Sequence, residues 1–580
     1  MPWTYGGQTI SQPGTIVVAD NSGISAPPNT NIRELVLIGS SGGGKPKTVL
    51  TITDPTQAQQ LLVSGQGLTA VLRALRPSTD DNRTPGVVKF VRVDPALQST
   101  YNLVNGATTV VTLTSVDYGD YTKQISTQVQ AGSIQGLKAT ITPAGGVPIT
   151  QDNIYQSLIS VQYTGAAASG LLTVSNASNQ MQGLSGASGS ETVQWTASFA
   201  TYTTVQQLIN YINSQPGWTA SLLTANPNSA TANGMDDATA VPCKASAATI
   251  TGTLQSLVNW YNSTGIVTAT RTANTGLLPS TMSAPAYFTG GSNGTITNTD
   301  WSDAYKALQN ESAARIITPI SGDSSIHAMG DAHCALMSDP KTRKNRVQIV
   351  GGVKGETVSQ VLARAQLLNS RRTTLVWPGI QDIDPFTLTL TTYDPYIAAA
   401  QAAGILSSMK ITNALTRQVI ACKGLEGTLQ QTLLDSDYDN LTDNGVMAIK
   451  FFSNTQGNAF RFVRSVTTWL QDKKLVNVEI SCVCTEDYVN IRVGDAVDAL
   501  IGQDGAPVTV GMVSSAIDSQ CRQLFEEQVL VGDTLAESYG NIQVNLSQGA
   551  VTSSFNATIP APLNFAGITT KFGLYSSNAA

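Results

Sequence analysis

The sequence predicts an α/β (α+β) core with a parallel or mixed sheet, an inserted β-rich outer domain and extended terminal arms. Three observations support this fold class. From residue 300 onward, strand-like runs alternate with helical patterns, which is typical of βαβ units. Residues 101–290 hold only ten charged residues, whereas the whole chain has 33 basic and 39 acidic ones. Both ends are polar and rich in Gly, Pro and Ser, yet each contains a short apolar run.

Length and composition exclude several classes of protein. A chain of 580 residues exceeds one ordinary core, so we expect about two to four domains. Charged residues make up 12%, about half the usual share. With a net charge of −6, the chain has no basic footprint for nucleic acid. No apolar run is long enough for a membrane span, and the N-terminus lacks a secretory pattern, so we expect a soluble product made in the cytoplasm.

The first part of the core is expected at residues 25–100. The apolar run Leu35–Ile38 predicts a strand, a glycine connection follows, and Thr48–Ile52 predicts a second strand. Asp54 and Pro55 form a good helix start, after which leucines and valines supply an apolar stripe as far as Leu75. Residues 86–94, "GVVKFVRVD", predict another strand.

Residues 101–288 are interpreted as the inserted outer domain. Short alternating stretches such as "ATTVVTLTSV" predict strands, and Gly, Asn and Ser separate them. Two helical patterns interrupt the strands, near Val205–Ile212 and Leu254–Tyr261. The aromatic and aliphatic residues argue against disorder. The polar composition permits carbohydrate binding on a host surface without requiring it.

The second part of the core is expected at residues 289–555. The pattern predicts the following elements up to residue 377: strands at Arg315–Ile320, Arg346–Gly351 and Thr373–Trp377, with helices at Ser325–Met337 and Thr357–Leu368 between them. Beyond Gly424 it predicts helices near Thr428–Leu434, Tyr488–Ile501 and Val513–Leu530, with strands near Val446–Phe452, Phe460–Val466 and Val476–Cys484.

The two ends, residues 1–24 and 556–580, are expected to be arms. Their extendable residues are Thr15, Ile16, Val17 and Val18 at one end and Leu563, Phe565, Ile568 and Phe572 at the other. Such ends either fray or add a strand to a neighbour's sheet, where backbone hydrogen bonds supply affinity with little demand on sequence.

One stretch approaches a phosphate-binding loop. From Gly39 to Lys45 the sequence reads G-x-x-x-x-G-K, but Pro46 stands where the motif needs Ser or Thr. Proline has neither an N–H nor a hydroxyl, and it biases Lys45 away from the helix that the motif opens. We therefore expect a glycine turn between two strands, with Lys45 as a surface charge or an intersubunit contact, and no nucleotide.

Other candidate sites are weaker. His327, Asp331 and Cys334 share one face of a predicted helix, where a half-buried structural face is favoured over a metal site. Cys482 and Cys484 would point to the same side of a strand, without a second pair at zinc-site spacing. We expect buried or inert thiols at all six cysteines, with disulfides formed outside the cytoplasm as the alternative. The sequence holds only two histidines, which leaves little room for histidine-based catalysis.

Several segments together resemble the tail sheath proteins of contractile-tailed phages and related injection machines. The most specific is "FTGGSNGTITNTDWSDAYKAL" at 288–308, a glycine-rich loop followed by a capped helix. The segments "RRTTLVWPG", "NGVMAIKFF" and "FRFVRSVTTWLQDK" also fit, as does the stretch beginning "QPGTIVVAD". The resemblance covers roughly 15–95 and 288–530, but not residues 101–288, where sheath proteins vary.

The resemblance implies a non-enzymatic structural subunit that uses no cofactor or metal. Such subunits polymerise as stacked rings around a tail tube, exchange strands through both arms, and contract to drive the tube through the host envelope. The implied partners are further copies of the chain, the tail tube protein, and the baseplate and tail terminator proteins; the implied location is the virion tail. Asp518, Arg522, Glu526 and Glu527 on the C-terminal helix are candidate tube contacts, unless that helix simply packs on the core.

Two alternatives stay open at this point. One is a different β-rich virion structural protein, and the other is a Rossmann-like nucleotide-binding enzyme. Self-assembly of the purified chain would favour a sheath. Thermal stabilisation by ATP or NAD would favour an enzyme.

Overall fold

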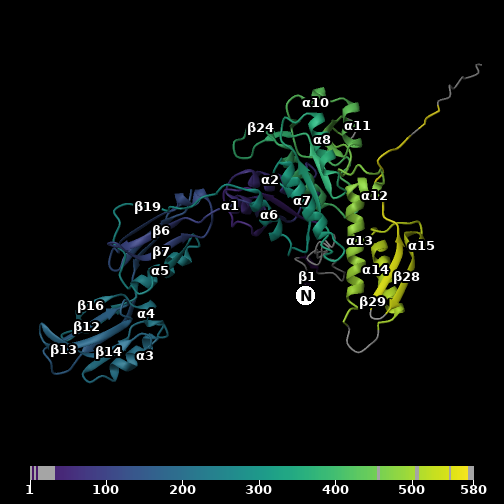
Figure 1. Ribbon diagram of the computed structural model, residues 1–580. Helices are drawn as coiled ribbons and strands as arrows, with labels where there is room; N and C mark the ends of the chain where they lie inside the picture. Colours follow the sequence, from purple (N-terminus) through teal and green to yellow (C-terminus); the bar gives the residue numbers. More distant parts are fainter. Residues whose placement is uncertain are drawn as a thin grey trace, which may run out of the picture.

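A computed structural model of the chain describes residues 3–5, 8–10, 33–453, 457–502, 508–547, 550–567 and 569–571. Its described part is elongated (Figure 1). A core holds the middle, two β-rich lobes extend from one side of it, and a helix pair with a hairpin lies on the other.

An eight-stranded sheet organises the core, in the order β27-β26-β22-β21-β20-β3-β5-β4. Its six inner strands are parallel, and β4 and β27 pair antiparallel at the two edges. The inner strands β3, β21 and β22 are almost wholly buried, which is why they appear in the sequence as continuous apolar runs. The predicted α/β core with a mixed sheet is confirmed. The strand bounds are β3 Glu34–Gly39, β4 Val49–Ile52, β5 Val88–Arg92, β20 Ala314–Pro319, β21 Val347–Gly351, β22 Thr373–Trp377, β26 Val446–Phe452 and β27 Ala459–Phe462.

Helices cover both faces of this sheet because successive strand residues point to opposite sides. Leu35 and Leu37 of β3 pack with α1, α2 and α9, whereas Val36 and Ile38 pack with α6 and α7. Helices α8 and α11 cover the second face over β22 and β26. Nearly every residue of α9 is buried. The helix bounds are α1 Pro55–Leu62, α2 Gln66–Leu75, α6 Asn298–Ala307, α7 Ser324–Met337, α8 Val358–Leu368, α9 Pro395–Ser408 and α11 Asp435–Asp443.

The lobe nearer the core has its own apolar centre around Leu113, Val129 and Tyr261. A three-stranded sheet, β18-β7-β6, and a four-stranded sheet, β10-β9-β8-β19, share that centre with α5. The bounds are β6 Thr100–Asn105, β7 Thr108–Ser115, β8 Ser126–Ala131, β9 Leu137–Thr142, β10 Ile149–Ile154, α5 Thr253–Ser263, β18 Val267–Arg271 and β19 Ala286–Tyr287, with a 3-10 turn at Asp120–Gln124.

The second lobe lies farthest from the core (Figure 1). Its sheets β15-β11-β17 and β14-β13-β12-β16 enclose an aromatic centre that includes Tyr163, Trp195 and Trp218. The bounds are β11 Ser157–Tyr163, β12 Ser169–Ser175, β13 Gln180–Ala187, β14 Ser190–Ser198, α3 Val205–Asn213, β15 Trp218–Leu222, α4 Thr231–Gly234, β16 Ala238–Pro242 and β17 Ala248–Thr251.

The C-terminal part adds two long helices and a hairpin beside the core. Helix α14 packs between α13 and the hairpin strand β28. The bounds are α12 Leu475–Val478, α13 Ile480–Asp498, α14 Val510–Glu526, α15 Leu535–Ser538, β28 Tyr539–Ser547 and β29 Ala550–Ala557. The remaining short elements are β1 Trp3–Tyr5, β2 Gln8–Ile10, β23 Ile380–Ile383, β24 Leu390–Tyr393, β25 Gly424–Leu425, α10 Leu429–Thr432 and a 3-10 turn at Asp81–Arg83.

Some predicted elements differ from the structure. The strand predicted at Val476–Cys484 is wrong, because these residues form α12 and the start of α13. Cys482 and Cys484 therefore lie on a helix, where residues two apart do not share a face. The stripe that ends at Leu75 belongs to two helices, separated by Val63, which has a φ of +61°, and by Gly65. The helix predicted near Thr428–Leu434 is only a single turn, α10.

Candidate functional site

The glycine-rich turn between β3 and β4 has no free phosphate cradle. The amides of Ser41, Gly42, Gly43 and Gly44 donate to Asp94 Oδ2 (3.0 Å), Ser64 O (2.9 Å), Leu62 O (2.9 Å) and Asp117 Oδ1 (2.9 Å). Gly44 has a φ of +93°, which favours glycine. Lys45 is exposed. The turn serves backbone geometry, as the sequence predicted.

Arg92, at the end of β5, joins this turn to the base of the outer lobes. Its side chain is completely buried, and its Nε lies 3.1 Å from Asp94 Oδ2. Its Nη1 donates to the carbonyl oxygens of Gly44 (2.8 Å) and Tyr118 (3.0 Å), and its Nη2 donates to Asn293 Oδ1 (2.9 Å). One guanidinium therefore links the core sheet and the glycine turn to the two segments that connect the core with the lobes, at Asp94 and at Asn293.

The face of α7 that carries His327, Asp331 and Cys334 is structural. His327 Nε2 donates to Ser321 O (2.8 Å), and Asp331 Oδ1 accepts from Thr373 Oγ1 (2.7 Å). Burial lowers the pKa of His327 to about 4 and raises the pKa of the Cys334 thiol to about 12. In the part of the chain that the structure describes, no three His, Cys, Asp or Glu side chains gather as a metal site would require.

All six cysteines are free thiols. Burial raises the pKa of Cys243, Cys482 and Cys521 to about 11 and that of Cys422 to about 12. Because the thiolate is the reactive form, these groups are inert at neutral pH.

Helix α14 presents the candidate tube contacts in two different settings. Val513, Ile517 and Leu524 form its buried face. Asp518 is half-buried, and its Oδ1 accepts from the Tyr539 hydroxyl of β28 (2.8 Å). Arg522 and Glu526 are exposed.

Glu527 accepts from Tyr488 and pairs with Arg492, both on α13 (3.4 and 3.5 Å). The helix thus uses Asp518 and Glu527 for packing inside the subunit. Arg522 pairs with Asp518 one turn away (3.4 Å), and both Arg522 and Glu526 lie on the exposed side of the helix.

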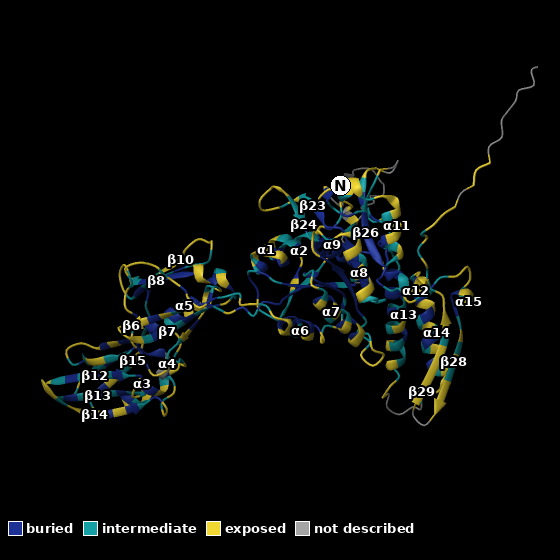
Figure 2. Cartoon of the chain, turned by 45° about the horizontal axis from the view of Figure 1, so that its top comes forward, coloured by how far each residue is buried: buried dark blue, intermediate teal, exposed yellow. Residues whose placement is uncertain are grey.

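The hairpin β28–β29 is a two-stranded antiparallel sheet. Ile542 and Val544 turn toward the core, whereas Gln543 and Asn545 are exposed. No further strand pairs with either outer edge within the described residues. Figure 2 shows the hairpin as one of the most exposed parts of the C-terminal region. Two open edges of this kind can accept added strands.

The segment after the hairpin is anchored to the core before it leaves. Asn564 Nδ2 donates to Glu479 Oε1 (2.8 Å), and Arg464 Nε donates to the same oxygen (2.7 Å). Glu479 is completely buried, and burial raises its pKa. The neighbours Leu563 and Phe565 are 85% and 78% exposed. We call the contact of Asn564, Glu479 and Arg464 the C-terminal clasp.

The clasp changes where an extended arm can begin. Thr558, Asn564 and Phe565 contact their own subunit, although Leu563 and Phe565 were predicted to exchange strands with a neighbour. An exchanged segment that leaves these contacts intact would start beyond Phe565. Nothing in the sequence marked Asn564 or Glu479 as partners. Thr15, Ile16, Val17, Val18, Ile568 and Phe572 lie outside the described residues.

Comparison with known proteins shows similarity to phage tail sheath proteins. A family model described as the phage tail sheath protein central domain matches residues 294–468. The putative tail sheath protein of Enterococcus phage phiEF24C is 26% identical over 492 residues, or 83% of each chain. The tail sheath protein of Bacillus phage SP01 is 24% identical over 579 residues, covering 98% of this chain and 96% of its own.

A solved structure shows the same fold. The sheath tail protein from Desulfitobacterium hafniense superposes with a TM-score of 0.52 at 12% identity, covering 94% of this chain and all of that one. No helix in the described ranges is long and apolar enough to cross a membrane. Residues 294–468 therefore form the central domain of a phage tail sheath protein, and the chain is similar to tail sheath proteins along nearly its whole length.

Proposed function

We propose that this chain is the repeating subunit of a helical sheath, which polymerises around a tail tube and shortens to drive the tube through the host envelope. The observation that carries the proposal is the hairpin β28–β29 with two open edges, beside a C-terminal tail that leaves the core extended. The hairpin packs on α14 through β28, and its two outer edges pair with no further strand of the described residues, so added strands from other copies would complete the sheet.

The contacts between the core and the outer lobes suit a subunit that moves as one rigid body. The buried Arg92 contacts tie the lobes to the core, so rotation of the core would carry the lobes with it. The strand-exchanging ends would keep neighbours connected while cores slide. Energy for shortening would come from better burial in the contracted lattice. A nucleotide is not proposed as the source, because the amides of the glycine-rich turn between β3 and β4 already have protein acceptors.

The partners follow from this role. Further copies of the chain would bind at β28–β29, and the tail tube protein would contact the exposed side of α14 at Arg522 and Glu526. Baseplate and tail terminator proteins would bind the two ends of the sheath. Assembly would take place in the host cytoplasm before the particle is released.

Removal of residues 567–580 tests the strand-exchange mechanism without disturbing the clasp. We expect the full chain to form tubes visible by electron microscopy and the truncated chain to stay folded and monomeric. A matched control is Leu336→Ser, which changes an exposed apolar residue on α7 away from the hairpin. Tubes from the truncated chain, at the concentration where the full chain forms them, would show that this tail is not exchanged.

A further inference from the structure

A cavity of about 270 Å³ lies between the start of the parallel strands and helix α13. Three arginines line it: Arg33, Arg315 and Arg492. Two carboxylates, Asp487 and Asp495, also border it. Neither the glycine turn nor the hairpin is part of this cavity, and nothing in the proposed strand exchange uses it.

The guanidinium of Arg33 is the unusual group. The residue is only 1% exposed, and its Nη2 donates to the carbonyl oxygen of Lys410. Its Nε and Nη1 are buried without a hydrogen-bond partner in the described part of the chain. Arginine keeps its charge inside proteins, so this site holds a buried positive charge with unsatisfied donors.

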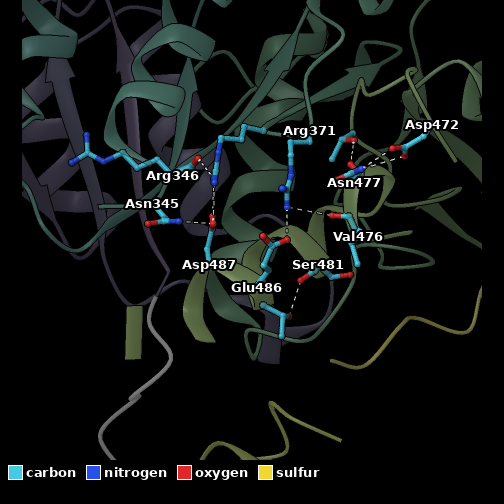
Figure 3. A network of polar contacts seen from close by, with 12 residues as sticks. Asn345, Arg346, Arg371, Asp472, Val476, Asn477, Ser481, Glu486 and Asp487 are labelled. Carbon is cyan, nitrogen blue, oxygen red and sulfur yellow. Dashed lines mark hydrogen bonds and ion pairs between the residues drawn. The ribbon is translucent and has the colours of Figure 1, made fainter. Parts of the chain in front are cut away.

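The other charges at the cavity do not neutralise Arg33. Asp487 is engaged by Arg372 through two contacts (2.7 and 3.0 Å) and by Asn345 Nδ2 (2.5 Å), and Figure 3 shows Asn345 and Asp487 pointing toward each other. Asp495 is exposed, where solvent and salt screen its charge.

The remaining two arginines differ in their pairing. Arg492 bonds the Tyr488 hydroxyl (2.5 Å) and pairs with Glu527 (3.5 Å). Arg315 donates only to the carbonyl oxygen of Asn345 (3.3 Å) among the described residues. Arg33 and Arg315 therefore present two guanidinium groups without a paired anion.

We propose that this cavity is a receptor for a carboxylate side chain presented by a second copy of the chain. A guanidinium matches the two oxygens of a carboxylate or phosphate, and the volume is below the range of roughly 300–1,000 Å³ typical of small-molecule sites. The second copy as the source rests on the proposed self-assembly. A free inorganic oxyanion is the other source of the same chemistry, and the experiment distinguishes the two.

The first measurement uses the full chain below its assembly concentration. Sodium phosphate, compared with sodium chloride at equal ionic strength, should raise the Tm of the wild type by about 2–4 °C in a saturable manner. Arg33→Met and Arg315→Met should each abolish this shift. Arg343→Met, which removes the ion pair with Asp498 of α13 and changes no residue that lines the cavity, should keep it. Equal shifts in all four proteins, or no shift in the wild type, would overturn the anion receptor.

The second measurement is tube formation by sedimentation. Arg33→Met should form tubes at least tenfold less efficiently than the wild type and should have a higher Tm without phosphate, since it removes an unpaired buried charge. Phosphate should inhibit wild-type assembly more than chloride does. If Arg33→Met assembles normally while phosphate still stabilises the wild type, the ligand is a free anion and the second-copy assignment is wrong. If Arg33→Met does not fold, Arg315→Met provides the same comparison. Failure of the wild type to form tubes would contradict the proposed function, and the phosphate titration would still decide the receptor.

Discussion

Replacing Arg92 with methionine should loosen the joint between the core and the outer lobes. The change keeps most of the apolar stem and removes the guanidinium that contacts Asp94, Gly44, Tyr118 and Asn293. Removing one partner of a buried ion pair destabilises by about 3–5 kcal/mol. Because Asp94 keeps its hydrogen bond from the Ser41 amide, we expect the lower end, about 3 kcal/mol.

Hydrogen exchange is the suitable assay because it reports local opening. A loss of about 3 kcal/mol corresponds to roughly a hundredfold faster exchange if opening is at equilibrium. The faster amides should be those of residues 42–44, with the β22 amides unchanged. Lys123→Met is the control: its ion pair with Asp120 is exposed on both sides, and we expect no measurable change. Unchanged exchange in Arg92→Met, or an equal effect in the control, would refute the role of Arg92 as a joint.

Three further outcomes follow from the structure. Asn564→Asp places a second carboxylate against the buried carboxylate of Glu479, and the two like charges should repel each other. Residues 558–565 should then become sensitive to protease. Retained protection would show that the clasp does not hold the tail. Burial lowers the pKa of His327 and His333 to about 4, so their contribution to the free energy of unfolding is complete above about pH 6.5 and is lost as the pH falls toward 4. The double His→Gln variant should show a shallower decline of urea midpoint over that window, and an identical decline would contradict this reasoning. ATP with magnesium should leave the Tm unchanged, and Pro46→Ser should not create binding because the loop amides already have acceptors; a saturable shift in either protein would contradict that account.

The core could be predicted where local pattern and tertiary environment agree. Strands β22 and β26 occupy the predicted residues, because the buried parts of parallel strands are continuous apolar runs. Helix α9 was missed because it is buried on all sides and has no polar face to give a helical period. Val476–Cys484 was mistaken for a strand because a short apolar run has the same composition in a strand and in a buried helix.

The candidate sites were only partly accessible from sequence. Pro46 predicted a turn in place of a phosphate loop, and the amides of that turn have protein acceptors in the structure. Arg92 and Asp94, two residues apart in a predicted strand, share a face and could have been recognised as a buried pair. Asn564 and Glu479 are 85 residues apart and carry no local signal, so only the folded chain brings them together. The cavity at Arg33 could not be predicted either, because residues of α13, more than 400 positions later in the sequence, form part of its lining.

The central claim is that this chain assembles by itself into a sheath through its terminal segments. Electron microscopy of the purified full chain tests it most directly. We expect long hollow tubes with a regular helical repeat, formed without nucleotide and with the outer lobes projecting from the surface. Particles that stay single at high concentration, with and without tail tube protein, would contradict the claim.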